Sequence, residues 1–160
     1  MAEQKTNVMR ILEQKKVRYI AHSYPHGKEP VDGITVARLI SLPAEMIYKT
    51  LVLRGVSGRI YVFDLPVCRE LDLKKAAKAA GEKSIAMIRP DELTAISGYV
   101  RGGCSPIGMK KAYPTFIHED AAELNTIIVS AGKIGMQVEL NPDELAKLTR
   151  ARYADICTEV

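Results

Sequence analysis

The chain has 160 residues, of which 47% are hydrophobic and 26% charged, and 23 basic residues against 19 acidic ones give a formal net charge of +4. This length fits one domain with a sizeable core, and the balanced composition excludes a disordered or low-complexity chain. No apolar run approaches the roughly 20 residues that cross a bilayer, and the polar N-terminal stretch lacks the apolar segment of a secretion signal, so we expect a cytoplasmic protein with no membrane partner.

Apolar spacing and turn residues divide the chain into short helices and strands. In chain order, we predict a helix over 7–16, a strand over 17–22, helical segments over 35–42 and 43–48, strands over 49–55 and 59–65, a helix over 71–81, a strand over 84–87, a helix over 89–97, strands over 114–118, 124–130 and 136–140, and a helix over 142–151. Asn7 is the predicted cap of the first helix, Gly81 closes another, and Pro90 and Pro142 begin two more. The three residues 56–58 between two strands predict a β-hairpin.

These elements alternate irregularly, without the regular strand–helix repeat of a doubly wound parallel sheet. Together with the predicted hairpin, this order indicates an α+β fold in which helices flank a mixed sheet. Neither an internal repeat nor a linker divides the chain, so residues 1–160 are predicted to form one domain.

Two glycine-rich segments predict shaped loops whose backbone approaches a ligand. GYVRGGCSPIGMKK, residues 98–111, combines four glycines with one proline and three basic residues, and SAGKIG, residues 130–135, repeats the pattern on a smaller scale. Two such loops can form an anion-binding nest or an oxyanion hole. Lys110, Lys111 and Lys133 lie beside these turns, where they either meet an anionic partner or are simply solvated. Neither loop matches a nucleotide-binding motif.

The cysteines and histidines offer weaker candidates. Cys104, inside the first loop, is either a nucleophile activated by nearby basic residues or a small residue turned inward, and we favour the second interpretation because no base is tied to it in sequence. The three cysteines form no C-x-x-C pair, which predicts free thiols. His22 and His26 are separated by Pro25 in a segment that is not helical, so we predict no metal site. The adjacent Glu119–Asp120 pair is predicted to begin a helix.

Lys49 opens a very apolar strand, so its ammonium is either extended toward solvent from the strand end or fixed at the rim of a pocket. In the second case it faces a phosphate or a carbonyl group.

The segments HSY, YKT, LDLKKAAKAAG, GYVRGGCSPIGMKK and VSAGKIG, in this order, resemble the YbaK/EbsC family over residues 5–158. Members of this family are freestanding aminoacyl-tRNA editing domains related to the editing insertion of bacterial prolyl-tRNA synthetase, and the best known are Cys-tRNA(Pro) deacylases. The resemblance implies a largely antiparallel, barrel-like mixed sheet with flanking helices.

The resemblance also implies the residues of the site. Lys49, in the Y-K-T motif, matches the family's signature functional residue and is the predicted catalytic residue. The resemblance implies substrate-binding roles for Tyr24, Thr50, Gly102, Gly103, Ser105, Pro106, Ser130, Gly132 and Gln137, and Lys110, Lys111 and Lys133 are candidate tRNA contacts. Two positions depart from the family: Cys104 stands where an aliphatic residue is frequent, and Gln137 where prominent members carry an aspartate.

The implied activity is removal of cysteine from mischarged Cys-tRNA(Pro), in which the substrate's own thiol attacks its ester. The implied partners are aminoacylated tRNA and prolyl-tRNA synthetase, no cofactor is expected, and a monomer is the expected oligomeric state. Two alternatives stay open: a tRNA- or synthetase-binding module without hydrolysis, and a deacylase of tRNA mischarged with alanine, serine or proline.

Overall fold

A computed structural model describes residues 5–159, so the two ends of the predicted domain, residues 1–4 and 160, lie outside the described part. Five α-helices and eight β-strands form within it. The helices are α1 (Asn7–Gln14), α2 (Gly33–Ile40), α3 (Leu73–Ala80), α4 (Leu93–Ser97) and α5 (Pro142–Thr149). The strands are β1 (Ile20–Ser23), β2 (Tyr48–Gly55), β3 (Ile60–Pro66), β4 (Ile85–Met87), β5 (Thr115–His118), β6 (Ile127–Ser130), β7 (Met136–Leu140) and β8 (Arg152–Ala154).

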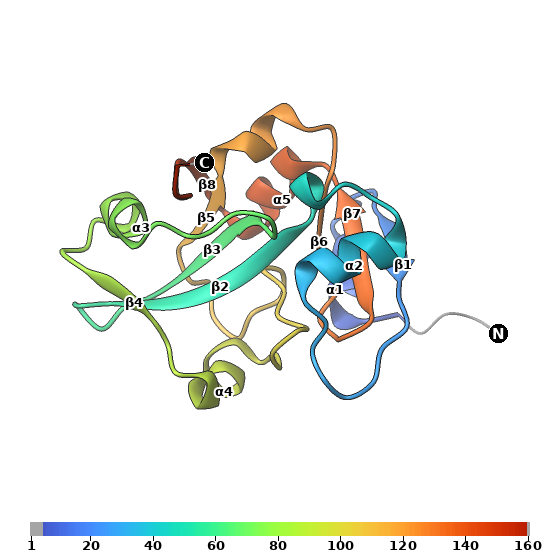
Figure 1. Cartoon of the computed structure of the whole chain (residues 1–160), viewed down its shortest axis with the longest axis horizontal. Helices are drawn as coiled ribbons and strands as arrows, with labels where there is room; N and C mark the ends of the chain where they lie inside the picture. Colours follow the sequence, from blue (N-terminus) through green and yellow to red (C-terminus); the bar gives the residue numbers. More distant parts are fainter. Residues whose placement is uncertain (1–4, 160) are drawn as a thin grey trace.

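The strands form two sheets and no closed barrel, which corrects the barrel-like sheet expected from the sequence (Figure 1). One sheet has the order β1-β7-β6 and is antiparallel, and the other has the order β4-β2-β3-β5-β8. In the larger sheet β4, β2 and β3 pair antiparallel, whereas β3, β5 and β8 run parallel. A single parallel bridge between Ile47 and Ile128 links the two sheets. Because helices flank a sheet with both parallel and antiparallel pairs, the α+β class and the mixed sheet are as predicted.

Three apolar clusters hold the helices against these sheets. In the first, Val8 and Leu12 of α1 and Leu145 of α5 pack on the three-stranded sheet. In the second, α3 covers the face of the five-stranded sheet that carries Phe63 and Leu65. A small third cluster holds α2 over the bridge between the sheets. Each fully buried side chain of this size contributes roughly 1.5–3 kcal/mol.

Helix ends follow local sequence signals, with one correction. Gly81 ends α3 in the left-handed conformation, with φ of 74°, and Pro142 begins α5, as predicted. The cap of α1 is Thr6, whose hydroxyl accepts the backbone N–H of Met9, and not the predicted Asn7. Both residue types cap helices well, so the sequence pattern leaves the choice ambiguous by one residue.

The predicted hairpin forms between β2 and β3, with Tyr48 opposite Pro66. The first strand begins later than predicted, at Ile20, and the short strand β8 was missed. None of the helices in residues 5–159 has the length and apolar character needed to cross a membrane.

Candidate functional site

A cavity of about 730 Å³ opens beside the N-terminal half of β2. The short strand β4 pairs with residues 53–55 of β2, and the N–H of Ile88, directly after β4, donates to the carbonyl of Val52. The edge of residues 48–51 is left without a partner in the five-stranded sheet. Residues 48–52 all contribute to the cavity wall. The volume lies within the roughly 300–1,000 Å³ typical of small-molecule sites.

Residues from five separate segments of the predicted site meet in this cavity. Those that line it are Tyr24, Lys49, Thr50, Gly102, Ser130 and Gln137. They come from the segment after β1, from β2, from the first glycine loop, from the end of β6 and from β7. The fold therefore joins motifs that are up to about a hundred residues apart in the chain.

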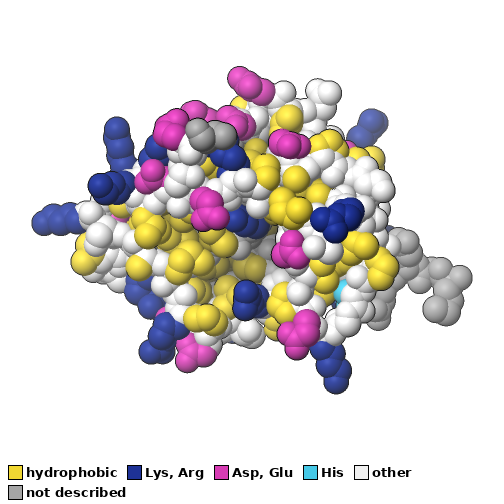
Figure 2. Space-filling model, in the orientation of Figure 1, with side chains coloured by type: hydrophobic (Ala, Val, Ile, Leu, Met, Phe, Trp, Pro, Cys, Tyr) yellow, Lys and Arg dark blue, Asp and Glu magenta, His cyan; other side chains and the backbone are white. Residues whose placement is uncertain are grey.

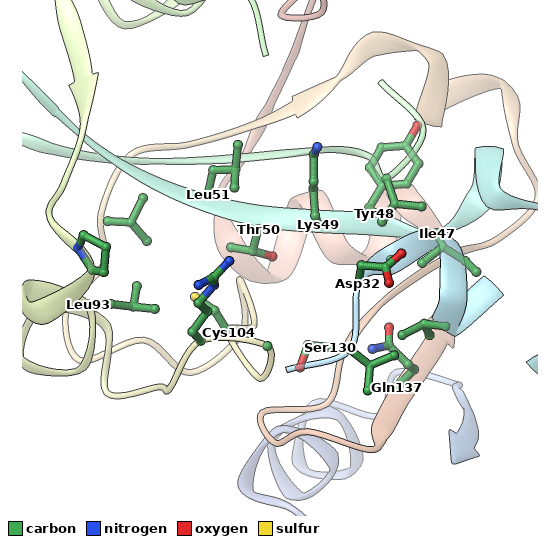
Figure 3. A pocket seen from close by; sticks show the side chains of 18 of the residues that line it. Asp32, Ile47, Tyr48, Lys49, Thr50, Leu51, Leu93, Cys104, Ser130 and Gln137 are labelled. Carbon is green, nitrogen blue, oxygen red and sulfur yellow. The ribbon is translucent and has the colours of Figure 1, made fainter. Parts of the chain in front are cut away.

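Lys49 lies at the cavity, on the opposite side of β2 from the first glycine loop. Figure 3 shows Lys49 and Leu51 pointing to one side of the strand, and Thr50 pointing to the other side, toward Cys104. This alternation is the normal two-residue period of a strand. Lys49 is partly buried, and no carboxylate in residues 5–159 forms an ion pair with its ammonium. The charge is therefore available to an anionic ligand.

The two glycine loops touch through their backbones. A Cβ atom on Gly103 would lie 2.9 Å from the Cα of Lys133 and 3.1 Å from the backbone nitrogen of Ile134. Gly102 has a φ of +87°, and a Cβ there would lie 2.8 Å from the Cβ of Pro30. Glycine is thus required at both positions, for close approach at one and for close approach and backbone conformation at the other.

Two backbone N–H groups of the glycine loops already have hydrogen-bond partners within the protein. The N–H of Gly103 donates to the carbonyl of Val100 at 3.0 Å, and the N–H of Gly132 donates to the hydroxyl of Ser130 at 3.1 Å. The N–H of Gly103 therefore serves the loop itself and is not free to form part of an oxyanion hole. Gly102 remains, as a wall residue of the cavity.

Four of the predicted substrate-binding residues lie outside the cavity wall: Gly103, Ser105, Pro106 and Gly132. Ser105 and Pro106 are buried, and the Ser105 hydroxyl accepts the backbone N–H of Ile107 at 3.2 Å. These contacts fix the shape of the first glycine loop. Ser105 and Pro106 thus support the cavity wall and do not form its surface.

Three polar side chains remain open to a ligand. Ser130 and Gln137 are opposite each other in the β6–β7 pair, and both line the cavity. Tyr24 is buried, and its hydroxyl has no hydrogen-bond partner in residues 5–159. A buried hydroxyl without a partner is unfavourable, so this group is suited to bind a ligand in the cavity.

Cys104 lines the cavity as a neutral thiol. Burial raises the pKa of the Cys104 thiol to about 12, and the charge of the nearby Asp64 adds to the increase. A nucleophilic cysteine needs a thiolate, which this environment disfavours. The structure thus agrees with the interpretation of Cys104 as a packed residue.

The other sequence candidates take ordinary structural roles. The imidazole of His22 contacts a carboxylate oxygen of Glu139 at 2.7 Å, whereas His26 is exposed and contacts its neighbour's carbonyl. Glu119 and Asp120 begin a short 3-10 helix, as predicted. The candidate tRNA contacts, Lys110, Lys111 and Lys133, are exposed and lie outside the cavity wall.

The sequence patterns missed several residues of the wall. Asp32, which caps α2 by accepting the N–H of Thr35, also lines the cavity. Arg101 is exposed and adds a cation to the wall, and Ile34 and Met87 are large apolar wall residues that are 43% and 52% exposed. Figure 2 shows hydrophobic side chains gathered on this face of the molecule, with single Lys and Arg side chains between them. An apolar rim with isolated cations fits a ligand that joins a flat apolar ring to a phosphate.

Asp64, in the middle of β3, was also missed. It is fully buried, and the Thr50 hydroxyl donates to its Oδ1 atom at 2.5 Å. Its Oδ2 atom has no partner in residues 5–159. Burial raises the pKa of Asp64 to about 7, and the hydrogen bond from Thr50 opposes the shift only in part.

This pKa predicts a pH-dependent stability. The ordinary pKa of the carboxyl is 3.8, so between that value and about 7 the folded chain holds a proton that the unfolded chain has released. The free energy of unfolding therefore falls as pH rises through this window. At each pH, the free energy of unfolding of Asp64→Asn is compared with that of the wild-type chain. We expect this difference to favour the variant by about 2–3 kcal/mol more at pH 8 than at pH 5. Urea unfolding at the two pH values measures this, and an equal difference at both would contradict it.

Comparison with known proteins gives matches both in sequence and in structure. A family model described as the aminoacyl-tRNA editing domain matches residues 29–148. An Enterococcus faecalis protein named as a candidate Cys-tRNA(Pro)/Cys-tRNA(Cys) deacylase, EbsC, is 45% identical over 157 residues, which cover 98% of this chain and 96% of that protein. A proline–tRNA ligase of Fervidobacterium nodosum is 27% identical over 128 residues, which cover 76% of this chain and 22% of the ligase.

The crystal structure of a candidate trans-editing enzyme for prolyl-tRNA synthetase has a similar fold. Its TM-score is 0.81 at 23% identity, and the alignment covers 98% of this chain and 100% of that chain. The two chains therefore share a fold over almost their full lengths.

Proposed function

The chain belongs to the aminoacyl-tRNA editing domain family, and from this premise we propose that it is a trans-editing deacylase that removes mischarged cysteine from Cys-tRNA(Pro). The family assignment and the 45% identical relative support aminoacyl-tRNA deacylase activity. The observation that carries the finer proposal is the cavity, because it gathers Lys49, Thr50 and Ser130 around one volume of about 730 Å³. The whole chain would act as a single editing domain.

The proposed chemistry uses the substrate's own thiol. The cysteinyl sulfur attacks the ester carbonyl, so that a carbon–sulfur bond forms and the bond from the carbonyl carbon to the ribose oxygen breaks. The thiol proton ends on that ribose oxygen, and the products are a cyclic thiolactone and free tRNA. A free thiol has a pKa of about 8.5 and so offers a usable thiolate fraction, unlike the side chains of serine or proline.

This chemistry supplies the selectivity that pocket size lacks. Contacts in a pocket separate small side chains by only about 1–3 kcal/mol, and cysteine and proline are similar in size. A positioned intramolecular attack adds a large effective-molarity advantage that only the thiol substrate has. The neutral Cys104 thiol of the protein supports this assignment, because it leaves the substrate as the source of the nucleophile.

We assign the protein side chains to positioning. Lys49 and Arg101 would bind the phosphate and terminal adenosine of the tRNA end, since both are cations of the wall. Tyr24 and Ser130 would hold the ester, and the Gly102 backbone would lie against it. Gln137 can donate and accept hydrogen bonds but cannot act as a base, so the chemistry would proceed without a carboxylate at this position.

Aminoacylated tRNA is the proposed partner. Prolyl-tRNA synthetase is a second one, because a ligase of that specificity contains a related region and a similar fold is named as a candidate trans-editing enzyme for it. Lys110, Lys111 and Lys133 are proposed to contact tRNA outside the cavity, and each phosphate contact that is lost should lower the salt dependence of binding by about one counterion.

The test compares tRNA(Pro) carrying cysteine, alanine or proline. We expect the purified protein to remove cysteine much faster than buffer does, to leave the prolyl ester intact, and to release thiolactone, detected by mass spectrometry in the presence of an amine trap. Loss of alanine or proline with cysteine retained would assign a different substrate. Binding without hydrolysis of any ester would instead mark a binding module, and free cysteine released without thiolactone would mean attack by water.

A further inference from the structure

The buried carboxylate of Asp64 accepts a hydrogen bond from Thr50, a residue of the cavity wall, and lacks a counter-charge. It stands opposite Thr50 in the β2–β3 pair, and its neighbour on the other side, in β5, is the apolar Ile117. From the first glycine loop, Cys104 comes close enough for the two groups to influence each other. No Lys, Arg or His in residues 5–159 forms an ion pair with Asp64.

A carboxylate in this setting is costly to keep. Acidic residues are almost never fully buried without a partner, and an isolated buried charge is strongly unfavourable. Lys49, the wall cation on the same strand as Thr50, points to the opposite side of β2 from Thr50, so it does not neutralise Asp64 (Figure 3). Within residues 5–159 no cation neutralises Asp64, so its ionised form is suited to a cationic group that enters the cavity.

The hydrogen bond to Asp64 fixes what Thr50 offers to a ligand. A threonine hydroxyl has one proton and two lone pairs. When Thr50 donates that proton to the Asp64 carboxylate, its lone pairs are left for the cavity that it lines. The Thr50 hydroxyl then accepts hydrogen bonds from a ligand and does not donate them.

We propose that Asp64, acting through Thr50, recognises the α-ammonium of the aminoacyl group. This inference rests on the proposed function, since it names the part of an aminoacyl ester that the floor of the cavity binds. Thr50 accepts a hydrogen bond from the ammonium, and Asp64 is a positioning residue that supplies the counter-charge. The cavity is thereby matched to both ends of the acylated terminus, with cations for its phosphate and an anion for its amine.

The experiment uses stable amide analogues of the acylated end, so that binding is measured without cleavage. The probes are tRNA(Pro) carrying alanine through a 3′-amide, with the α-amine either free or acetylated. Hydrogen bonds to charged groups are worth about 1.5–3 kcal/mol, so acetylation should weaken binding to the wild-type chain about 10- to 100-fold. In Asp64→Asn and in Thr50→Val the difference between the two probes should fall to within about twofold, and Thr50→Ser should restore it.

A pH series separates recognition from a structural role. Affinity for the free-amine probe should rise as Asp64 ionises and fall as the α-amine, with a pKa of about 8, loses its proton. In Asp64→Asn the rise in affinity on the acidic side of the profile (the acidic limb) should disappear, whereas the fall on the alkaline side should remain. The Cys104 thiol titrates far above this range, and the alanyl probe carries no thiol. A variant that weakens both probes equally and keeps the acidic limb would overturn the proposal.

The same variants distinguish this inference from the proposed function. If the wild-type chain prefers the free-amine probe but hydrolyses no aminoacyl ester, recognition of the amine stands and the deacylase assignment fails. If it hydrolyses Cys-tRNA(Pro) but binds both probes equally, the assignment stands and the inference about Asp64 is wrong.

Discussion

Replacing Lys49 with alanine is expected to lower kcat/KM for deacylation of Cys-tRNA(Pro) by at least about 100-fold, which is the effect of removing one preorganised electrostatic contact from an active site. Lys49 lines the cavity and is partly buried, and its ammonium has no ion-pair partner in residues 5–159, so its charge is available to the substrate. Because no protein carboxylate depends on it, its removal should leave the free energy of unfolding nearly unchanged. Initial rates on radiolabelled Cys-tRNA(Pro), together with urea unfolding, measure both effects.

Two further variants sharpen this test. Lys49→Arg keeps the charge but changes its shape, so an intermediate rate would indicate that charge is the main contribution. Cys104→Ala is the matched control within the same cavity wall, and it should keep most of the activity, because its thiol is protonated at neutral pH. A folded Lys49→Ala protein with near wild-type rates would remove Lys49 from the catalytic role.

The strand that carries Lys49 and Thr50 could be predicted from sequence, but the open edge that makes it a site could not. The apolar run over 49–55 and the turn after it specify a hairpin by local rules. That β4 pairs with only three residues of β2 depends on where the α3–β4 segment packs, which no local pattern records. The small strand β8 was missed for a similar reason, since its parallel pairing with β5 is a tertiary contact.

Asp64 shows a signal that the sequence contained and the predictions did not use. A carboxylate in the middle of the apolar run RIYVFDL is unusual, because acidic residues are rarely buried. Counting back across the turn at residues 56–58 would have placed it opposite Thr50, as the observed register does. The hydrogen bonds of the glycine loops carry no such signal. The donation of the Gly103 N–H to Val100 follows from a turn whose shape the spacing of glycines does not define.

The contact between the two glycine loops leads to the second large effect, which is expected for Gly103→Val. Gly103 lacks the positive φ of Gly102, so valine suits its backbone conformation and the obstacle is contact alone: its Cβ would lie 2.9 Å from the Cα of Lys133. Backbone atoms cannot turn aside as a side chain can, so the loops must separate, which moves Gly102 and Ser130 relative to Lys49. Misplacement of about 1 Å in an active site can lower rates about 100-fold, and overpacking costs about 1–3 kcal/mol of stability, so we expect losses of this size in the deacylation rate and in the free energy of unfolding of Gly103→Val.

Gly27→Val is the matched control, since a Cβ at Gly27 meets nothing within 4 Å, and its deacylation rate should stay within about twofold of wild type. Equal rates for the two valine variants would show that the spacing of the loops does not set the geometry of the site.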